Sequence, residues 1–441
     1  MSPQIMERRQ LLITGAAALS IGSRKILGAN DRVRMGIIGL GGRGNAHLGT
    51  YLSIPGAQVA ALVDVNQAAR ERANARVVKA DNPKATEYSD MRKLFDSKDV
   101  DAVSMATPNH WHALGAIWAM QAGKDTYCEK PASYNPFESR QMIAAARKYN
   151  RMCQIGSQSR STPHVMEAMQ LLKEGIIGKV YMAKGLCFKR RKSIGTKPDQ
   201  PVPPGLDWDM FLGPAPMRPY NELRFAYNWH WFWDTGNGDL GNQGVHQMDI
   251  ARWGMGLPNS HEGMKSAVST GGKYAYEDMQ ETPNTQFCSF DYGDRQIQFE
   301  VRGVLTGGEA SIGNPARATS AVGNLFYGVD GWMEIGDGYK VYKGETNELV
   351  KEGKSSRGSA DGTKLHMENF LAAVRSRNHK SLNAEIEIGA AAADLCHFGN
   401  IAYRVGKRLN WDNAKHQFDD AAANKLISRD YRKPYIVPSK P

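Results

Sequence analysis

A glycine-rich loop at residues 39–44 is the first feature of the sequence whose residue types and spacing suit a chemical task. It follows the apolar run Val33–Ile38 and reads Gly39-Leu-Gly41-Gly42-Arg43-Gly44. In a GxGxxG pattern the first glycine permits a tight turn, the second lets the backbone approach a pyrophosphate, and the third lets the next helix pack on the strand. Amides at the start of that helix then face the phosphate charge. The loop therefore predicts a dinucleotide-binding site.

A carboxylate stands where such a site needs one. The run Gln58–Val63 ends in Asp64, twenty residues after Gly44. A carboxylate at that strand end accepts hydrogen bonds from the ribose hydroxyls, and its charge disfavours a 2′-phosphate. The position favours NAD over NADP. The alternative interpretation is that Asp64 only shapes a turn or caps a helix.

Further apolar runs deliver polar residues to strand ends. Ala102–Ala106 stops at Thr107-Pro108-Asn109, where proline cannot continue a central strand. A helical pattern then runs from His112 to Met120. The next run, Asp125–Cys128, leads into Glu129 and Lys130.

Strands that alternate with helices predict a doubly wound parallel sheet. The next helix is marked by Asn135 as cap, Pro136 in the first turn and Glu138 in position for a capping box. Ligands in such sheets lie at the carboxyl ends of the strands. We therefore expect Asp64, residues 107–109 and residues 129–130 at the ligand-binding edge.

The N-terminus has the features of an export signal. Arg8-Arg9 precede a short apolar stretch, Gln10–Gly22, and small residues follow near Ala29. These features predict a twin-arginine signal over residues 1–29 and a periplasmic or otherwise exported protein. An amphipathic N-terminal helix is the alternative.

Composition excludes several other classes of protein. The 441 residues exceed one ordinary core, so two domains are expected, and no apolar run beyond the first thirty residues could cross a bilayer. The net charge of the whole chain is +11. The signal contributes four cations and one carboxylate, so its removal would leave a net charge of about +8. Five scattered cysteines without a CxxC pair predict no metal site.

The one dense basic run, Lys189–Lys192, lacks interleaved aromatic residues, so no nucleic-acid partner is expected. A solvated loop is the favoured interpretation of this run. An anionic sugar or polysaccharide partner is the alternative.

The motifs together resemble the Gfo/Idh/MocA oxidoreductases, named for glucose-fructose oxidoreductase, inositol dehydrogenase and a rhizopine-catabolism protein. The similarity rests on the glycine loop, Asp64, Thr107-Pro-Asn-x-x-His112 and Glu129-Lys130-Pro131. It continues over nearly all of the chain after the signal, through Gly156-Ser-Gln158, Leu206–Asp209, Gly213–Pro216, Gly236–Asp249 and His366–Phe370.

The resemblance implies an α/β fold of two domains: a Rossmann domain over residues 30–155 and a substrate-binding domain over 156–441. The second domain would hold a large, open, mostly antiparallel sheet that covers the nicotinamide and often packs into oligomers. Period-two runs at 286–290 and 296–301 and a helical pattern from Ile388 to Val405 agree with this. Beside the glycine loop and Asp64, we expect cofactor contacts from Thr107, Asn109, His112, Glu129 and Gln158.

The resemblance also implies the catalytic groups. Oxidation of an alcohol needs a base for the hydroxyl proton and a cation near the oxygen, beside the nicotinamide. In the family the lysine of Glu-Lys-Pro, here Lys130, contacts the reacting hydroxyl, and His246 handles protons. Many family dehydrogenases carry Asp four residues before this histidine, whereas this chain has Asn242. Because an amide cannot accept a proton at neutral pH, the base must be His246, Lys130 or another group.

Three further residues are candidates for substrate binding. Asp249, one helical turn after His246, could orient that histidine or bind sugar hydroxyls, or serve as a structural carboxylate. The aromatic segment Arg224–Trp233 could stack on sugar faces, although a strand core with buried tryptophans is the commoner explanation. Within it we expect Tyr227 and His230 to line the site.

Three functions follow for a small-molecule sugar or glycoside as ligand: a sugar dehydrogenase or sugar–sugar oxidoreductase, a redox-neutral NAD-dependent glycoside hydrolase or lyase, and a non-catalytic sugar-binding relative. Lys130 and His246 argue against the third, while Asn242 keeps the second open. An exported enzyme has no evident free NAD pool, so we expect a tightly bound cofactor.

Overall fold

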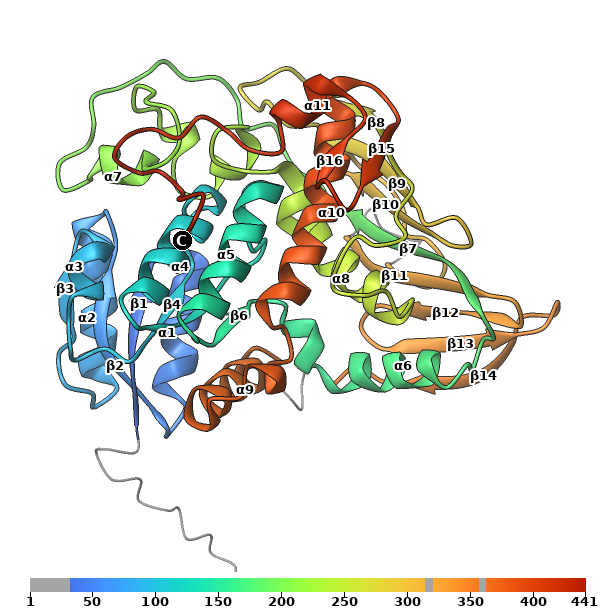
Figure 1. Cartoon of the computed structure of the whole chain (residues 1–441), viewed down its shortest axis with the longest axis horizontal. Helices are drawn as coiled ribbons and strands as arrows, with labels where there is room; N and C mark the ends of the chain where they lie inside the picture. The colour runs from blue at the N-terminus through green and yellow to red at the C-terminus, as the bar shows by residue number, and fades with distance from the viewer. Residues whose placement is uncertain (1–31, 314–319, 357–361) are drawn as a thin grey trace, which may run out of the picture. The chain divides into compact units, whose positions relative to one another are not determined.

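The computed structural model describes residues 32–313, 320–356 and 362–441. The predicted export signal at residues 1–29 lies outside the described residues. Residues 33–441 contain two sheets of different construction (Figure 1). No helix among the described residues has both the length and the apolar character needed to cross a membrane.

The first sheet is parallel, as predicted, and its strand order is β3-β2-β1-β4-β5-β6. Its strands are β1 (Val33–Ile38), β2 (Ala57–Val63), β3 (Thr86–Tyr88), β4 (Ala102–Met105), β5 (Asp125–Cys128) and β6 (Cys153–Ile155). The helices between them are α1 (Gly42–Leu52), α2 (Gln67–Lys79), α3 (Met91–Phe95), α4 (Asn109–Gln121) and α5 (Pro136–Lys148).

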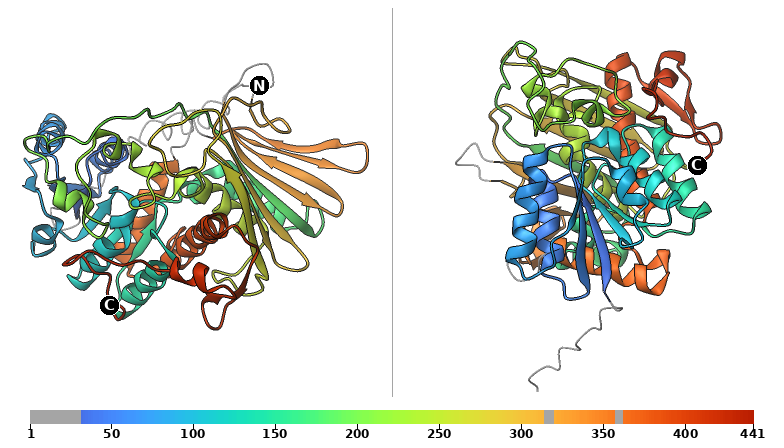
Figure 2. Two further views of the ribbon diagram at one scale, coloured as in Figure 1. Left: turned by 90° about the horizontal axis from the view of Figure 1, so that it is seen from above. Right: turned by 90° about the vertical axis from the view of Figure 1, so that its left-hand side faces the viewer.

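Helices cover both faces of this sheet, which explains its continuous apolar strands (Figure 2). Met35 and Ile37 of β1 pack with residues of α1 and α2, while Ile38 packs with residues of α3, α4 and α5. The capping prediction for α5 is confirmed, since Asn135 Oδ1 accepts from Glu138 N at 3.0 Å. The helix predicted from His112 begins three residues earlier, at Asn109, because Pro108 already stands at its N-cap.

The second sheet has ten strands in the order β14-β13-β12-β11-β7-β10-β9-β8-β15-β16. Only β7 and β10 pair in parallel, so the expected mostly antiparallel sheet is confirmed. Its strands are β7 (Val180–Phe188), β8 (Ser266–Gly272), β9 (Thr285–Asp291), β10 (Gln296–Arg302), β11 (Ala321–Gly328), β12 (Gly331–Ile335), β13 (Tyr339–Lys343), β14 (Glu348–Gly353), β15 (Leu409–Asp412) and β16 (Gln417–Phe418).

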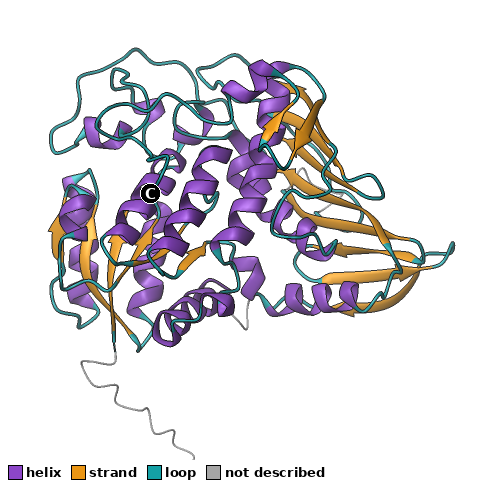
Figure 3. Cartoon of the chain, in the orientation of Figure 1, coloured by secondary structure: helices purple, strands orange, loops and turns teal. Residues whose placement is uncertain are grey.

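Helices pack on one face of this sheet (Figure 3). The later helices are α6 (Pro163–Lys173), α7 (Trp208–Leu212), α8 (Val245–Gly254), α9 (Gly362–Ser376), α10 (Ile386–Val405) and α11 (Ala421–Lys425). Alternate residues of β9 and β10, among them Phe290 and Phe299, are buried against α8 and α10. Helix α10 also contacts α5, so it joins the two sheets.

Two segments from the second half of the sequence complete the first core. Met367 and Phe370 of α9 pack with Met35 of β1. Near the C-terminus, Tyr435 lies against Trp111 of α4, with ring centroids 5.4 Å apart. The predicted domain boundary at residue 155 did not anticipate that α9 and the C-terminal segment would pack in the core of the first domain.

The aromatic segment Arg224–Trp233 is not a strand. It forms two 3₁₀ turns, Glu222–Arg224 and Asn228–Trp231, in the connection between α7 and α8. The interpretation of its aromatic residues as a strand core was wrong, since the segment pairs with no strand. Its rings pack on α7 instead, as shown by Phe225 and Phe211, whose ring centroids are 5.0 Å apart.

Candidate active site

The glycine loop joins β1 to α1 in a conformation that side chains would not permit. Gly39 has a φ of +82°, and a Cβ on Gly44 would lie 1.7 Å from the Gly39 carbonyl oxygen. By contrast, a Cβ on Gly41 or Gly42 would have no described atom within 4 Å. No side chain caps α1, so its first amides are available to a ligand. The loop has the free space and the donors that a phosphate group needs.

A pocket of about 140 Å³ opens beside this loop at the carboxyl ends of the strands. Gly41, Asp64 and Thr107 line it from the parallel sheet, and Phe211 and Trp229 line it from the second half of the chain. The Thr107 hydroxyl is buried with no hydrogen-bond partner in the described chain, as expected where a ligand supplies the partner. These features fit a nicotinamide dinucleotide.

A larger hollow of about 680 Å³ along β12–β14 contains none of the predicted site residues. Its lining includes Gly313 and Ser320.

Asp64 lies at the end of β2, as predicted, and both of its carboxylate oxygens accept backbone amides. Oδ2 accepts from Leu40 N at 2.6 Å, and Oδ1 accepts from Asn66 N at 2.8 Å. Burial raises the pKa of this carboxyl against the effect of these two bonds. The contacts show that Asp64 shapes the glycine loop, and its contact with a ribose stays a prediction.

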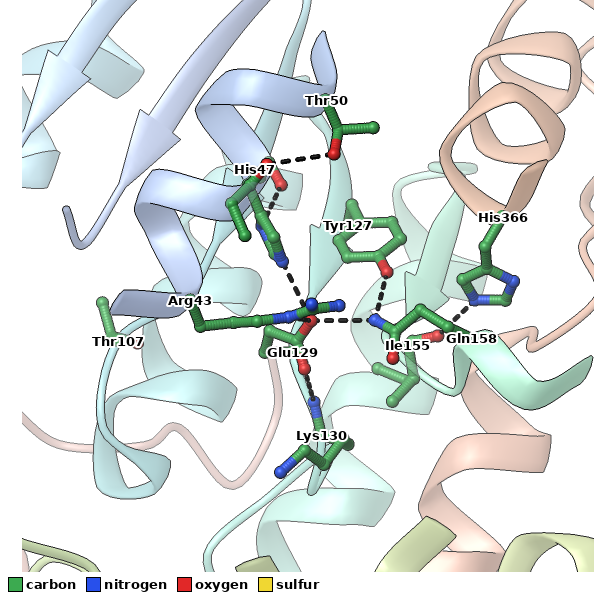
Figure 4. A network of polar contacts seen from close by, with 12 residues as sticks. Arg43, His47, Thr50, Thr107, Tyr127, Glu129, Lys130, Ile155, Gln158 and His366 are labelled. Carbon is green, nitrogen blue, oxygen red and sulfur yellow. Dashed lines mark hydrogen bonds and ion pairs between the residues drawn. The ribbon is translucent and has the colours of Figure 1, made fainter. Parts of the chain in front are cut away.

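Glu129 is the centre of a polar network between the glycine loop and the end of β5 (Figure 4). Its Oε1 accepts from Arg43 Nε at 2.7 Å and Gln158 Nε2 at 2.9 Å, and lies 2.9 Å from His47 Nε2. Burial opposes its ionisation, but the charge of Arg43 and the bond from His47 hold the pKa of Glu129 well below its usual value. The network ties together three of the residues predicted to lie at the cofactor: Arg43, Glu129 and Gln158.

Lys130 follows Glu129 directly and points into the second half of the chain. Its Nζ donates to the Asn242 carbonyl oxygen at 2.6 Å. Burial is the main cause that lowers the pKa of Lys130 to about 8; the charge of Glu129 opposes this decrease, and that of Arg43 adds to it. The ammonium is therefore the main form at neutral pH.

His246 stands at the start of α8, just after a π-helical turn at Leu240–Gly244. Its ring is half-buried, and no hydrogen bond to it is found within the described ranges. Burial, followed by the charge of Lys130, lowers the pKa of His246 to about 3. The imidazole is neutral at physiological pH and has a lone pair available for a proton.

Asn242 and Tyr227 meet on the same side as Lys130. Asn242 Nδ2 donates to the Tyr227 hydroxyl at 3.1 Å, and Arg191 Nη1 donates to that hydroxyl at 3.2 Å. Arg191 also pairs with Asp239, with Nε 2.8 Å from Oδ2. Direct contacts thus link three predicted residues, Lys130, Asn242 and Tyr227, and the charge of Lys130 also acts on a fourth, His246.

The other predicted residues have partners within the protein. Asn109 Nδ2 donates to Asn237 Oδ1 at 2.9 Å, and the two ring nitrogens of His112 lie 2.6 and 2.9 Å from the carbonyl oxygens of Pro131 and Thr107. His230 stacks on Trp229 at a centroid distance of 3.6 Å. These residues hold the strand ends and the aromatic turns in place.

Asp249 pairs with Arg160, at 2.8 Å between Oδ2 and Nε, and both side chains are largely buried. No hydrogen bond between Asp249 and His246 occurs in the described part of the chain. Of the two interpretations of Asp249, the contacts match the structural carboxylate.

Sequence reasoning missed His47, Arg160, Arg191 and Asp239. His47 and Arg160 carry no motif, because their partners are 82 and 89 residues away along the chain. Arg191 was assigned with its basic run to solvent, although the spacing of the run allowed alternate residues to face inward.

Family models match most of the chain. Residues 33–157 match an oxidoreductase family with an NAD-binding Rossmann fold. Residues 164–268 and 330–437 match the C-terminal alpha/beta domain of the same oxidoreductase family.

Curated relatives are similar over part of their length. A glycosyl hydrolase family 109 protein from Saccharopolyspora erythraea is 28% identical over 217 residues, which are 48% of this chain and 42% of that protein. An alpha-N-acetylgalactosaminidase from Shewanella oneidensis is 30% identical over 152 residues, 34% of this chain and 33% of that protein. The matches thus span less than half the length of these relatives.

Solved structures share the fold. The WlbA dehydrogenase from Bordetella pertussis, solved with NADH and UDP-GlcNAcA, has a TM-score of 0.63 at 17% identity and covers 86% of this chain and 99% of its own. A levoglucosan dehydrogenase, solved with NADH and levoglucosan, has a TM-score of 0.64 at 18% identity with the same coverage. Because the two family models together match residues 33–157, 164–268 and 330–437, this chain belongs to the Gfo/Idh/MocA family of oxidoreductases.

Proposed function

We propose that this chain is an NAD-dependent oxidoreductase that acts on a hydroxyl group of a sugar or sugar-like polyol and holds its cofactor tightly. The proposal rests mainly on the hydrogen bond from Lys130 Nζ to the carbonyl oxygen of Asn242, which lies in the turn that leads to His246. This contact puts a cation and a neutral imidazole at the carboxyl edge of a dinucleotide-binding sheet, where ligands of such sheets bind.

The two side chains supply what alcohol oxidation needs from the protein. When bound, NAD supplies the acceptor for the hydride that leaves the carbon. His246, whose ring is neutral, is the group that we propose accepts the hydroxyl proton. Lys130 Nζ donates to the substrate oxygen and stabilises the negative charge that develops there.

Tight retention of the cofactor is supported by a strap, residues 205–229, that lines the pocket on the side away from the sheet. Gln67 N donates to Gly205 O at 2.9 Å, Asp207 N donates to Val65 O at 3.0 Å, and Trp111 Nε1 donates to Met210 O at 2.9 Å. Phe211, Phe225 and Trp229 of the strap line the pocket. We expect these bonds to slow the release of a dinucleotide.

We also propose that the protein is exported, because residues 1–29 have a twin-arginine pattern. A protein that leaves the cytoplasm folded can carry its cofactor with it. The redox state of the bound cofactor would then be restored by a second sugar, by an external acceptor or within one catalytic cycle.

A redox-neutral glycoside hydrolase is the second candidate, favoured by Asn242 and by the names of the curated relatives. After the same first oxidation, a proton leaves the carbon next to the new carbonyl, the glycosidic bond breaks and water adds. Return of the hydride then restores the cofactor.

Labelled water separates the two candidates. A hydrolase acting on a glycoside in deuterated water should release a sugar with deuterium at the carbon next to the oxidised centre, and no net NADH should form. A dehydrogenase should give an uncleaved keto-sugar without deuterium at that carbon. Mass spectrometry of the products measures both, and a glycoside panel without either product would contradict both candidates.

Asp64→Asn should relax discrimination against NADP, because it removes the charge that repels a 2′-phosphate while it keeps one oxygen for Leu40 N. The measurement compares NAD and NADP affinities of protein stripped of nucleotide. Asp99→Asn, which removes an exposed carboxylate of the same domain, is the control. An unchanged preference would mean that Asp64 does not face the ribose.

Lys130→Met should leave the nucleotide bound but lower sugar-dependent turnover by at least about a hundredfold, since the variant loses one donor to the developing charge. Lys93→Met, at an exposed position of α3, should keep normal turnover.

In the wild type, kcat/KM should fall as the pH rises through about 8, because the ammonium of Lys130 is then lost. Turnover that rises through this range would assign Lys130 the role of a base instead.

A further inference from the structure

The basic run Lys189–Lys192 directly follows β7 and forms backbone hydrogen bonds with the end of β10. Lys189 N donates to Arg302 O at 3.1 Å, and Arg191 N donates to Gly303 O at 2.8 Å. Lys189 and Arg191 are half-buried, whereas Arg190 and Lys192 are exposed. Because side chains alternate along an extended chain, two of the four cations face inward and only the other two match a solvated loop.

The two inward cations differ in their partners. Asp239 is almost fully buried, and its two carboxylate oxygens pair with Arg191 at 2.8 and 2.6 Å. Arg191 also lies over the ring of Trp231, 5.1 Å from its centroid. The charge of Arg191 is therefore neutralised, and its role is to hold Asp239 and the aromatic turn together.

Lys189 has no such carboxylate. Its Nζ reaches Gln243 Oε1 at 3.4 Å, and no ion pair to it is found across the described ranges. Gln243 lies three residues before His246 and next to Asn242, whose carbonyl accepts from Lys130. The charge of Lys189 also contributes to lowering the pKa of both Lys130 and His246.

The charges around this space do not balance. Arg43, Lys130 and Lys189 all act on His246 as cations, and Glu129 is the one carboxylate among its main electrostatic neighbours. The carboxylate of Glu129 is already engaged by Arg43, His47 and Gln158. Asn242 adds hydrogen bonds but no negative charge. Cations thus outnumber carboxylates among the charged groups that act on His246.

We propose that the substrate of this site is an acidic sugar, whose anionic group is bound by Lys189 while its reacting hydroxyl lies between Lys130 and His246. The inference rests on the proposed function for the nature of the ligand as a sugar. A carboxylate of a uronic acid and a sulfate ester offer the same chemistry to an ammonium, namely a charge-assisted hydrogen bond.

The test measures the binding of matched sugar pairs to the cofactor-loaded full chain by calorimetry. The pairs are methyl glucoside with methyl glucuronide, methyl galactoside with methyl galacturonide, and glucose with glucose 6-sulfate. In at least one pair the acidic sugar should bind about tenfold more tightly than the neutral one, and added salt should reduce this preference. The third pair distinguishes sulfate from carboxylate.

Two lysine variants localise the effect. Lys189→Met should abolish the preference for the acidic sugar, whereas Lys192→Met, which removes an exposed lysine of the same run, should preserve it. Equal binding of acidic and neutral sugars in every pair, or a preference that survives Lys189→Met, would overturn the inference.

Turnover of the same sugars distinguishes this inference from the proposed function. Oxidation or cleavage of neutral sugars with no acidic preference would contradict the inference and support the function. Acid-selective binding that depends on Lys189, with neither cofactor reduction nor product, would support the inference and contradict the function.

Discussion

The buried carboxylate of Glu129 is the constraint on which the rest of the site depends. A buried charge is costly unless cations and hydrogen-bond donors surround it. Its donors come from two separate segments: Arg43 and His47 from α1, and Gln158 from the turn after β6. Their geometry fixes the end of β5, and with it the backbone of Lys130, which is the next residue. The cofactor loop and the proposed catalytic lysine therefore share one electrostatic support.

The second sheet positions the other half of the chemistry. Phe299 of β10 would contact a Cβ on Gly185 of β7 at 2.7 Å and on Gly244 at 2.8 Å, so only glycines let the turn before α8 come this close to the sheet. His246 follows two residues later. Arg160, in the 3₁₀ turn at Gln158–Ser161, forms an ion pair with Asp249 of α8. The packing of α8 thus sets where a neutral imidazole meets Lys130, and α9 and α10 bind the two halves together.

Much of this could be predicted from the sequence, because glycine spacing, strand-end polar residues and period-two runs are local signals. The glycine loop and the parallel sheet follow from such patterns, whereas the antiparallel sheet was expected from the family resemblance, with which the period-two runs agree. The Arg224–Trp233 turns did not, since tertiary packing of aromatic rings on α7 decides their conformation. Partners such as His47 for Glu129, Arg160 for Asp249 and Asp239 for Arg191 are distant in sequence and had no local signal. The inward pair Lys189 and Arg191 needed the bonds to β10 to be recognised.

The central claim is that this chain carries NAD as a resident group beneath the strap. The most direct measurement is the nucleotide content of protein purified without added nucleotide, released by denaturation and identified by mass spectrometry. The account predicts NAD in an amount equimolar with the chain. Protein that releases no nucleotide, and that binds neither NAD nor NADP when these are added, would contradict it.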